Sequence, residues 1–280
     1  AIGGGFELTK ERKGNIQKTF GPDKVWFLAV PKGNTVNLAP NLLLEGSPWT
    51  NLKVRQAAHL WFDRDELVLA ARGGMGEPAS LFNPNSVWGN PDLMKLPGYN
   101  PATRAADRKK SKELLAEAGY PNGFETRFMC RRQWVFQCEP IMGQLINMGL
   151  KVILEPEDDA SLASRSDKGD FEIKLNGPGN VLPEEYETSY APRSKYAQSA
   201  NPHEDMKVQA LFDRLGKAVG LEARIAIAKE MEQYIAFDQI IAIQLYDIWG
   251  THAYRTYVRG VPLPAVNPRI LLSRTYTWLD

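Results

Sequence analysis

The sequence contains none of the residue patterns that commonly carry catalysis. It has no Gly-x-Ser-x-Gly, His-Glu-x-x-His, Gly-x-x-x-x-Gly-Lys-Ser/Thr or Gly-x-Gly-x-x-Gly motif, the patterns that place a nucleophile, a zinc ion or a nucleotide phosphate. Adjacent carboxylates occur at Asp158-Asp159 and Glu184-Glu185, but such pairs in loops are usually solvated. We therefore expect a protein that binds a molecule without transforming it.

The histidines do not indicate a metal site either. The chain has 3 of them, at positions 59, 203 and 252, and metal ligands usually recur at much shorter spacings. We expect no metal and no cofactor.

Three short segments carry side chains suited to hold a small polar ligand. In the first, two guanidiniums beside an indole suit a ligand carboxylate and an apolar or sugar face. The second is a glycine-rich turn with two asparagines, and in the third two aromatic rings bracket a carboxylate. Each also has a purely structural alternative: solvated arginines, a turn built for geometry, and aromatic rings packed in a core. The candidate ligand-binding residues are Arg131, Arg132, Gln133 and Trp134, then Asn176, Gly177 and Asn180, and finally Tyr246, Asp247 and Trp249.

The only two cysteines, Cys130 and Cys138, flank the first of these segments. Their spacing matches neither a zinc motif nor a thioredoxin motif. Two free thiols are the simpler interpretation. One short-range disulfide is the alternative, and it would require an oxidising compartment.

Composition limits the class of protein. The chain has 280 residues, 43% hydrophobic and 24% charged, which is typical of one large or two ordinary globular domains. A formal net charge of +1 gives no field that would attract nucleic acid or an anionic membrane. No apolar run approaches the length of about 18 residues that a membrane-spanning helix needs. The first ten residues lack a signal-peptide pattern, so we expect that a signal was removed or that the natural N-terminal part is absent.

Strand and helix patterns alternate along most of the chain, which predicts an α/β domain with at least part of its sheet parallel. The first 45 or so residues are predicted as short extended pieces, one of which ends at Pro31. Helices are expected after the capping residues Asn51 and Asp63, the second ending at Gly73. Further strands are predicted at 41–44, 124–130, 151–154, 171–175 and 240–246, and further helices after Asn100 and near 141–148, 205–218 and 221–237.

Several segments, in order, resemble family 5 of the extracellular solute-binding proteins, which serve oligopeptide, dipeptide, nickel and some oligosaccharide importers. Residues 51–58 with 62–65 resemble the family signature D-V-R-V-R-Q-A-L…A-I-D-R-E, and 114–123 (L-L-A-E-A-G-Y-P-N-G) resembles L-L-A-E-A-G-Y-P-D-G-F. Arg55 and Arg64 in the signature are expected to anchor helices. Shorter resemblances lie at 74–79, 144–152, 169–172 and 278–280.

The resemblance implies an α/β, periplasmic-binding-protein-like lobe of type II, the peptide-binding class, with a mixed sheet. Family members are about twice as long as this chain and enclose their ligand between two lobes. Residues 1–45 are then expected to be hinge strands with a remnant of the first lobe, 46–245 the second ligand-binding lobe, and 246–280 the return into the first lobe. Most of the first lobe would lie outside this chain.

By the same resemblance the protein is the substrate-binding component of a bacterial ABC importer. It would capture a small polar solute, such as a peptide or an oligosaccharide, and deliver it to a membrane permease. Many peptide-binding relatives carry Gly-Trp and a nearby Asp after the strand that ends near Leu175. This chain has Pro178 at the Trp position and no Asp in residues 176–183, which puts the usual anchor for a peptide amino terminus in doubt.

The expected partners are the ligand, the ABC permease and the missing first lobe, with no nucleic acid. The expected location is periplasmic or extracellular, with membrane anchoring through an absent N-terminal segment left open. The alternative function is a secreted hydrolase acting on oligosaccharide or peptide, which would consume the ligand.

Overall fold

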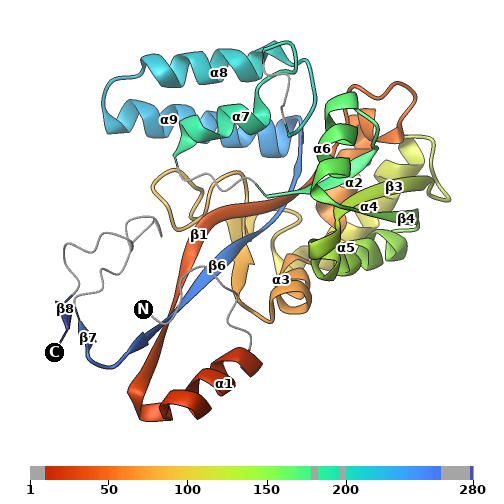
Figure 1. The fold of residues 1–280 in the computed structure, drawn as a ribbon. Helices are drawn as coiled ribbons and strands as arrows, with labels where there is room; N and C mark the ends of the chain where they lie inside the picture. Colours follow the sequence, from red (N-terminus) through yellow and green to blue (C-terminus); the bar gives the residue numbers. More distant parts are fainter. Residues whose placement is uncertain (1–9, 178–181, 196–199, 260–277, 280) are drawn as a thin grey trace.

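The structure is a computed structural model and describes residues 10–177, 182–195, 200–259 and 278–279. Helices and strands alternate through most of this range (Figure 1). The helices are α1 (Lys10–Phe20), α2 (Leu52–Trp61), α3 (Arg64–Arg72), α4 (Arg104–Glu117), α5 (Val135–Asn147), α6 (Asp159–Lys168), α7 (Glu187–Tyr190), α8 (Met206–Lys217) and α9 (Leu221–Glu232), which continues as a π-helix (Gln233–Asp238). The strands are β1 (Val25–Pro40), β2 (Gly76–Pro78), β3 (Glu125–Arg131), β4 (Lys151–Glu157), β5 (Ile173–Asn176), β6 (Ile243–Arg255), β7 (Val258–Arg259) and β8 (Trp278–Leu279).

The main sheet is mixed, as the sequence predicts. Its strand order is β2-β6-β1-β5-β3-β4. β3 is parallel to both β4 and β5, whereas β1, β2 and β6 pair antiparallel. Parallel pairing requires crossover connections, and α5 supplies one between β3 and β4. The α/β fold class with a mixed sheet is therefore confirmed.

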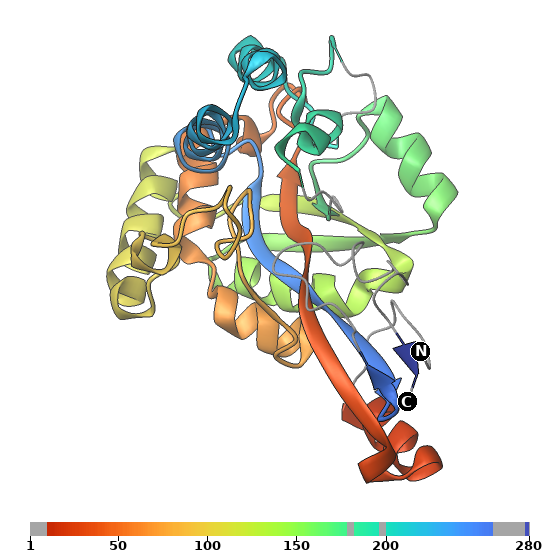
Figure 2. The same ribbon diagram turned by 90° about the vertical axis from the view of Figure 1, so that its left-hand side faces the viewer.

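β1 and β6 form a long two-stranded ribbon that leaves the body of the molecule (Figures 1 and 2). They pair from Val25 opposite Arg255 to Leu38 opposite Ile243, with the register shifting between Pro31 and Thr35 and again between Val36 and Asn37. The prediction that the first strand ends at Pro31 is wrong. The ladder is interrupted where proline lacks a donor and then resumes.

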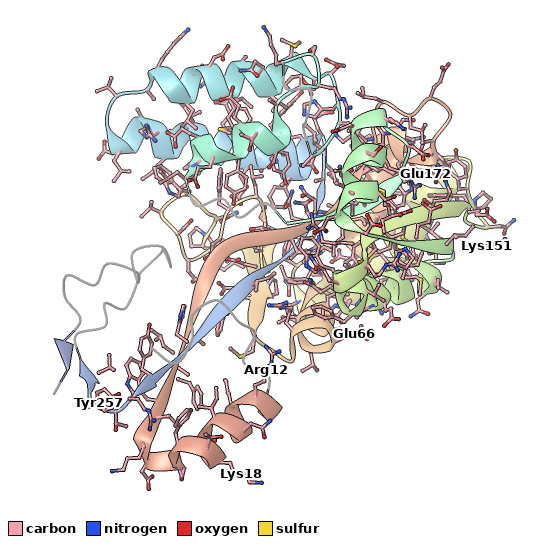
Figure 3. The ribbon with its side chains drawn as sticks, viewed as in Figure 1. Arg12, Lys18, Glu66, Lys151, Glu172 and Tyr257 are labelled. Atoms are coloured by element: carbon pink, nitrogen blue, oxygen red, sulfur yellow. A yellow bond between two sulfur atoms is a disulfide. The ribbon has the colours of Figure 1, made fainter. Side chains whose placement is uncertain are left out.

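The far end of the ribbon carries the first helix. Residues 10–20 form α1 rather than an extended piece, so the expectation of short extended pieces fails there. The Arg255 guanidinium lies 4.0 Å from the Phe20 ring centroid, which attaches α1 to β6. Figure 3 places Lys18 and Tyr257 at this end, with Glu172 and Lys151 on the opposite side of the molecule.

The two helices of the signature segment begin where the sequence predicts, and the second also ends where the sequence predicts. The Asn51 side chain accepts a hydrogen bond from Lys53 N at 2.9 Å, and Asp63 caps α3 by accepting from Glu66 N at 3.0 Å. Gly73 ends α3 with φ 58, a left-handed conformation that costs glycine little. Local sequence was sufficient to predict these ends because caps act within one helical turn.

Two buried arginines anchor these helices, as the sequence predicts, and they do so by donating to backbone carbonyls in and around the start of β6. Arg55 donates to the carbonyls of Ile240 at 3.0 Å and Trp49 at 2.9 Å. Arg64 donates to Gln244 O at 2.9 Å. Each guanidinium satisfies carbonyls that would otherwise be buried without a donor, so both residues belong to the scaffold.

The core divides into two hydrophobic clusters. One cluster packs α2, α3, α4 and α5 against one side of the sheet. The second lies among α7, α8, α9 and the loop that contains Leu81 and Trp88. Buried polar side chains occur where the sheet meets the α7 region.

Three other expectations need correction. Residues 41–44 form a turn, because Asn41 uses its side chain to bind Gly169 O at 2.9 Å and to accept from Leu43 N at 3.1 Å. α5 begins at Val135, before Pro140, although the sequence suggested a start at residue 141. α6 was not predicted at all; Asp158 caps it and Gly169 ends it.

Candidate functional site

The parallel strands β3, β4 and β5 end at the same edge of the sheet, where ligands of open α/β sheets usually bind. Arg131 is the last residue of β3 and pairs in register with Glu157 at the end of β4. Asn176 is the last residue of β5. The first two predicted segments are therefore brought to one edge.

One level of the sheet carries a row of polar side chains across four strands. Met129 on β3 pairs with Lys174 on β5, so Arg131 and Asn176, each two residues further along parallel strands, lie at the same level. Asn176 in turn pairs with Asn37 on β1, and Asn37 pairs with Gln244 on β6. We call Arg131, Asn176, Asn37 and Gln244 the polar row.

The polar row has hydrogen-bonding groups that no other described residue satisfies. Asn37 and Gln244 are fully buried and donate to the Tyr190 hydroxyl at 3.2 and 2.9 Å. Asn37 Oδ1, Gln244 Oε1, Asn176 Nδ2 and Arg131 Nε are buried atoms that have no partner among the residues described. Buried polar atoms are normally paired with protein, water or ligand, so the row can accept and donate several more bonds.

Tyr190 on α7 contacts two members of the polar row, because its hydroxyl accepts from Asn37 and Gln244. Burial raises the pKa of its hydroxyl, so the group stays neutral at physiological pH. Gln244 and Tyr190 are members of this arrangement that sequence reasoning missed. Each is a polar residue inside an otherwise apolar segment. That pattern indicates a site only when the strand order shows which residues lie beside it.

Arg131 is held in place by two neighbours. Its Nη1 lies 2.8 Å from Asp159 Oδ1, and its guanidinium lies 4.7 Å from the Trp134 ring centroid. Asp159 stands in the first turn of α6, where a carboxylate also interacts favourably with the helix dipole. The sequence offered no obvious counter-charge for Arg131 because Asp159 comes from the helix that follows the next strand.

The two adjacent arginines have different surroundings. Arg132 and Gln133 are exposed, and Arg132 makes no ion pair with any residue that the structure describes. Trp134 is half-buried and packs against the first core cluster. Of the pair, only Arg131 belongs to the polar row.

Cys130 and Cys138 are joined by a disulfide, and both are fully buried. The simpler interpretation of two free thiols is therefore wrong, and the alternative of one short-range bond holds. The bond connects the last part of β3 to the first turns of α5 and closes residues 131–137 into a loop. In the chain-entropy model such a closure stabilises the fold by about 2–3 kcal/mol.

A buried lysine lies beside the row. Lys174, two residues before Asn176, donates from Nζ to Ser166 Oγ at 3.1 Å. Burial lowers its pKa to about 8, because desolvation disfavours the charged form. This ammonium adds positive charge to the side of the sheet that α6 covers.

The second segment is described only in part. Asn176 and Gly177 are half-buried, whereas Asn180 lies outside the described residues. The contribution of Asn180 stays a prediction.

The third segment is deeper in the molecule. Tyr246 and Asp247 are fully buried. The Tyr246 hydroxyl donates to Gln137 Oε1 at 3.1 Å, and Asp247 Oδ2 accepts from Asn83 Nδ2 at 2.6 Å. Trp249 is half-buried, and its Nε1 has no partner among the residues described. The structure thus ties Tyr246 to the helix that follows the Arg131 loop.

The described residues contain no group of three or more His, Cys, Asp or Glu residues that could hold a metal ion. No helix in the same part of the chain is long and apolar enough to cross a membrane.

Comparison with known sequences identifies relatives. Residues 8–200 match the sequence model of the bacterial extracellular solute-binding proteins, family 5, middle region. Over 84 residues the chain is 40% identical to heme-binding protein A of Haemophilus influenzae, a match that covers 30% of this chain and 14% of that protein. Over 79 residues it is 42% identical to the glutathione-binding protein GsiB of Pectobacterium atrosepticum, covering 28% and 14% of the two chains.

Solved structures have the same fold. HbpA2 from Haemophilus parasuis superposes with a TM-score of 0.78 at 22% identity, over 96% of this chain and 52% of that one. DppA from Helicobacter pylori, in complex with the peptide STSA, gives 0.76 at 17% identity, over 99% and 52%. The chain therefore spans about half the length of these structures.

Proposed function

Because the chain belongs to family 5 of the bacterial extracellular solute-binding proteins, we propose that it is part of the substrate-binding component of an ABC importer. In that role the protein captures a small polar solute outside the cytoplasm, in the periplasm or at the cell surface, and delivers it to a membrane permease. The polar row carries this proposal, because it gathers unsatisfied donors and acceptors at one level of the sheet.

The proposed division of the chain follows the ribbon. Residues 46–245 would form the second ligand-binding lobe, and residues 1–45 and 246–280 would supply hinge strands and a part of the first lobe. Two observations support this division. β1 and β6 leave the body side by side (Figure 2), and the structures with the same fold are about twice as long.

Capture would operate by lobe closure. A ligand shifts the equilibrium between open and closed forms only by contacting both lobes in the closed form. The polar row, with Trp134 beside it, would supply the contacts from this lobe. A micromolar dissociation constant corresponds to about −8 kcal/mol, which several charge-assisted hydrogen bonds to a buried ligand can provide.

Arg131 would provide the main polar contact. Asp159 and the Trp134 ring fix the direction of its guanidinium, and its Nε is buried without a partner among the described residues. A pre-oriented fork of this kind suits a carboxylate or another strongly accepting group of the ligand. The relatives' names include heme, glutathione and peptide as ligands, and for this chain we propose a small solute with such an acceptor group, whether peptide, oligosaccharide or similar.

The test uses the full-length protein. Whatever co-purifies with it is released by denaturation and identified by mass spectrometry, and the same solute is then titrated back by calorimetry. We expect saturable binding, recovery of the solute unchanged, and a dissociation constant raised about tenfold or more in Asn37→Ala. Arg214→Ala, at an exposed ion pair on α8, is the matched control.

Two results would contradict the proposal. A steady loss of solute in proportion to protein would show hydrolysis instead of capture. Equal affinities for wild type, Asn37→Ala and Arg131→Ala would show that the polar row is not the ligand site.

A further inference from the structure

A pocket of about 210 Å³ lies where α9 passes into the π-helix and faces the loop at residues 90–91. It shares no lining residue with the polar row. The residues that line it are Asn90, Pro91, Lys229, Glu232, Gln233 and Phe237.

The pocket contains a buried carboxylate without a cationic partner. Glu232 is only 3% exposed. Its Oε1 accepts a long hydrogen bond of 3.4 Å from Phe82 N, and no described lysine, arginine or histidine forms an ion pair with it. Burial raises the pKa of this carboxyl to about 7, although hydrogen bonds from Ser80 and Phe82 N and the charge of Lys229 act in the opposite direction. A buried carboxylate is costly unless a positive charge compensates it.

Lys229 lines the same pocket from the next turn of the helix. Residues three apart on a helix are neighbours on its surface, and both of these residues line the pocket. They do not form an ion pair with each other, and Lys229 is exposed whereas Glu232 is buried. The pocket thus presents one positive and one negative group at different depths.

The remaining walls combine an aromatic ring with amide groups. The Phe237 ring makes edge contacts with His59 at 5.6 Å and a tilted contact with Tyr99 at 6.2 Å between ring centroids. Gln233 and Asn90 add amide groups at the rim. The wider π-turn, a feature often found at functional sites, sets the spacing of Gln233 and Phe237.

We propose that this pocket binds a small zwitterion of the amino-acid type, with its ammonium group against Glu232 and its carboxylate against Lys229. A simple cation would be attracted by Glu232 but repelled by Lys229. A simple anion would be attracted by Lys229 but repelled by Glu232. A molecule with both charges satisfies both residues. The site lies within one lobe and is independent of the proposed transport function, because it needs no second lobe to close over it.

Three small probes that share a methyl group next to the charge-bearing carbon test the charge requirement. L-Alanine carries both charges, ethylammonium carries only the positive one, and propionate carries only the negative one. Binding to the full-length protein is followed by ligand-detected NMR of the methyl group that all three share. We expect saturable binding of alanine and at least about tenfold weaker binding of each singly charged probe.

Variants assign the binding to this pocket. Glu232→Gln keeps an acceptor for Phe82 N but removes the charge, and should weaken alanine binding about tenfold or more. Lys229→Met should weaken it by a smaller factor, since Lys229 is exposed. Glu230→Gln, a neighbouring exposed carboxylate paired with Arg214, is the matched control and should leave alanine binding unchanged. Thermal unfolding of each variant checks that it is folded. If Glu232→Gln does not fold, Lys229→Met provides the test.

Three outcomes overturn the proposal. The first is no saturation at concentrations where a millimolar dissociation constant would be visible. The second is ethylammonium or propionate binding as tightly as alanine. The third is alanine binding that is equal in wild type and in the folded Glu232 and Lys229 variants, because that binding would belong to another site.

Discussion

The hydroxyl group of Tyr246 donates a hydrogen bond of 3.1 Å to Gln137 Oε1, and both side chains are buried. Gln137 directly precedes Cys138, whose disulfide closes the loop that carries Arg131. One hydrogen bond therefore connects β6 with the loop of the polar row. The position and the order of that loop depend on β6 as well as on the disulfide.

Removal of this hydroxyl tests the connection. Tyr246→Phe keeps the packed ring and leaves the Gln137 oxygen without its donor, which should lower the free energy of unfolding by about 1–3 kcal/mol. Urea unfolding followed by circular dichroism measures the loss. The control is Tyr257→Phe, whose ring is 49% exposed, and it should leave stability unchanged. Equal stability of the two variants would show that the Tyr246 bond contributes nothing.

The disulfide should be present in protein recovered from an oxidising compartment. A thiol reagent added to unfolded, unreduced protein should find no free thiol. Reduction, or the paired substitution of Cys130 and Cys138 by serine, should lower stability by about 2–3 kcal/mol because a closed loop is opened in the unfolded chain. Two reactive thiols per chain before reduction would contradict the bond.

The two arginines of the loop should differ in their effect on ligand binding. In the full-length protein, Arg131→Ala should cost about 2–5 kcal/mol of binding free energy, because it leaves a buried acceptor of the ligand unpaired. Arg131→Lys should recover only part of this, since an ammonium does not reproduce the planar fork. Arg132→Ala should change the affinity by less than about 0.5 kcal/mol, as surface substitutions usually do.

Calorimetry with the identified solute measures all three variants. If the alanine variants of both arginines bind as tightly as wild type, the loop is not the anchor. The segment with Tyr246, Asp247 and Trp249 would then become the better candidate.

His59 should make stability depend on pH. Burial lowers the pKa of its imidazole to about 3, and the neighbouring Arg64 acts in the same direction. In the unfolded chain the group has its ordinary value of 6.5, so between these values the unfolded state binds more protons. Stability from the neutral imidazole is therefore complete above about pH 6.5 and is lost as the pH falls towards 3.

The measurement compares wild type with His59→Gln in urea at several pH values. Over this range the free energy of unfolding of wild type should fall more steeply, by about 1.4 kcal/mol for each pH unit in which only the unfolded imidazole is protonated. Carboxylates titrate in both proteins and cancel in the difference. Parallel curves for the two proteins would refute the assignment to His59.

The features that were predicted from the sequence are those decided within a few residues. Asn51 and Asp63 predict where two helices start, because a capping side chain contacts a backbone N–H only two or three residues away. Gly73 predicts a helix end, because a helix often ends at a residue with left-handed backbone, here with φ 58, and glycine adopts that conformation at little cost. The strand at 124–130 and its parallel partner were found for a similar reason, since each is a short run with apolar character between turn residues.

The features that were missed depend on neighbours that are distant in the chain. Asp159 neutralises Arg131 only because β4 lies beside β3. Gln244 belongs to the site only because β6 pairs with β1 at the level of Asn37. The strand order must be known before such residues can be grouped. The residue pattern of a single sequence does not reveal that order.

The shift of register between Pro31 and Thr35 bears on how the long ribbon can deform. A continuous ladder of hydrogen bonds couples two strands so that they bend and twist as one stiff plate. At the interruption the cross-bonds are missing, and the backbone there resists bending less than on either side. The ribbon is thus less stiff at this level than towards α1, and torque applied to the end that carries α1 concentrates strain at residues 31–35. Backbone amides at that level should exchange their hydrogens faster than those at either flank.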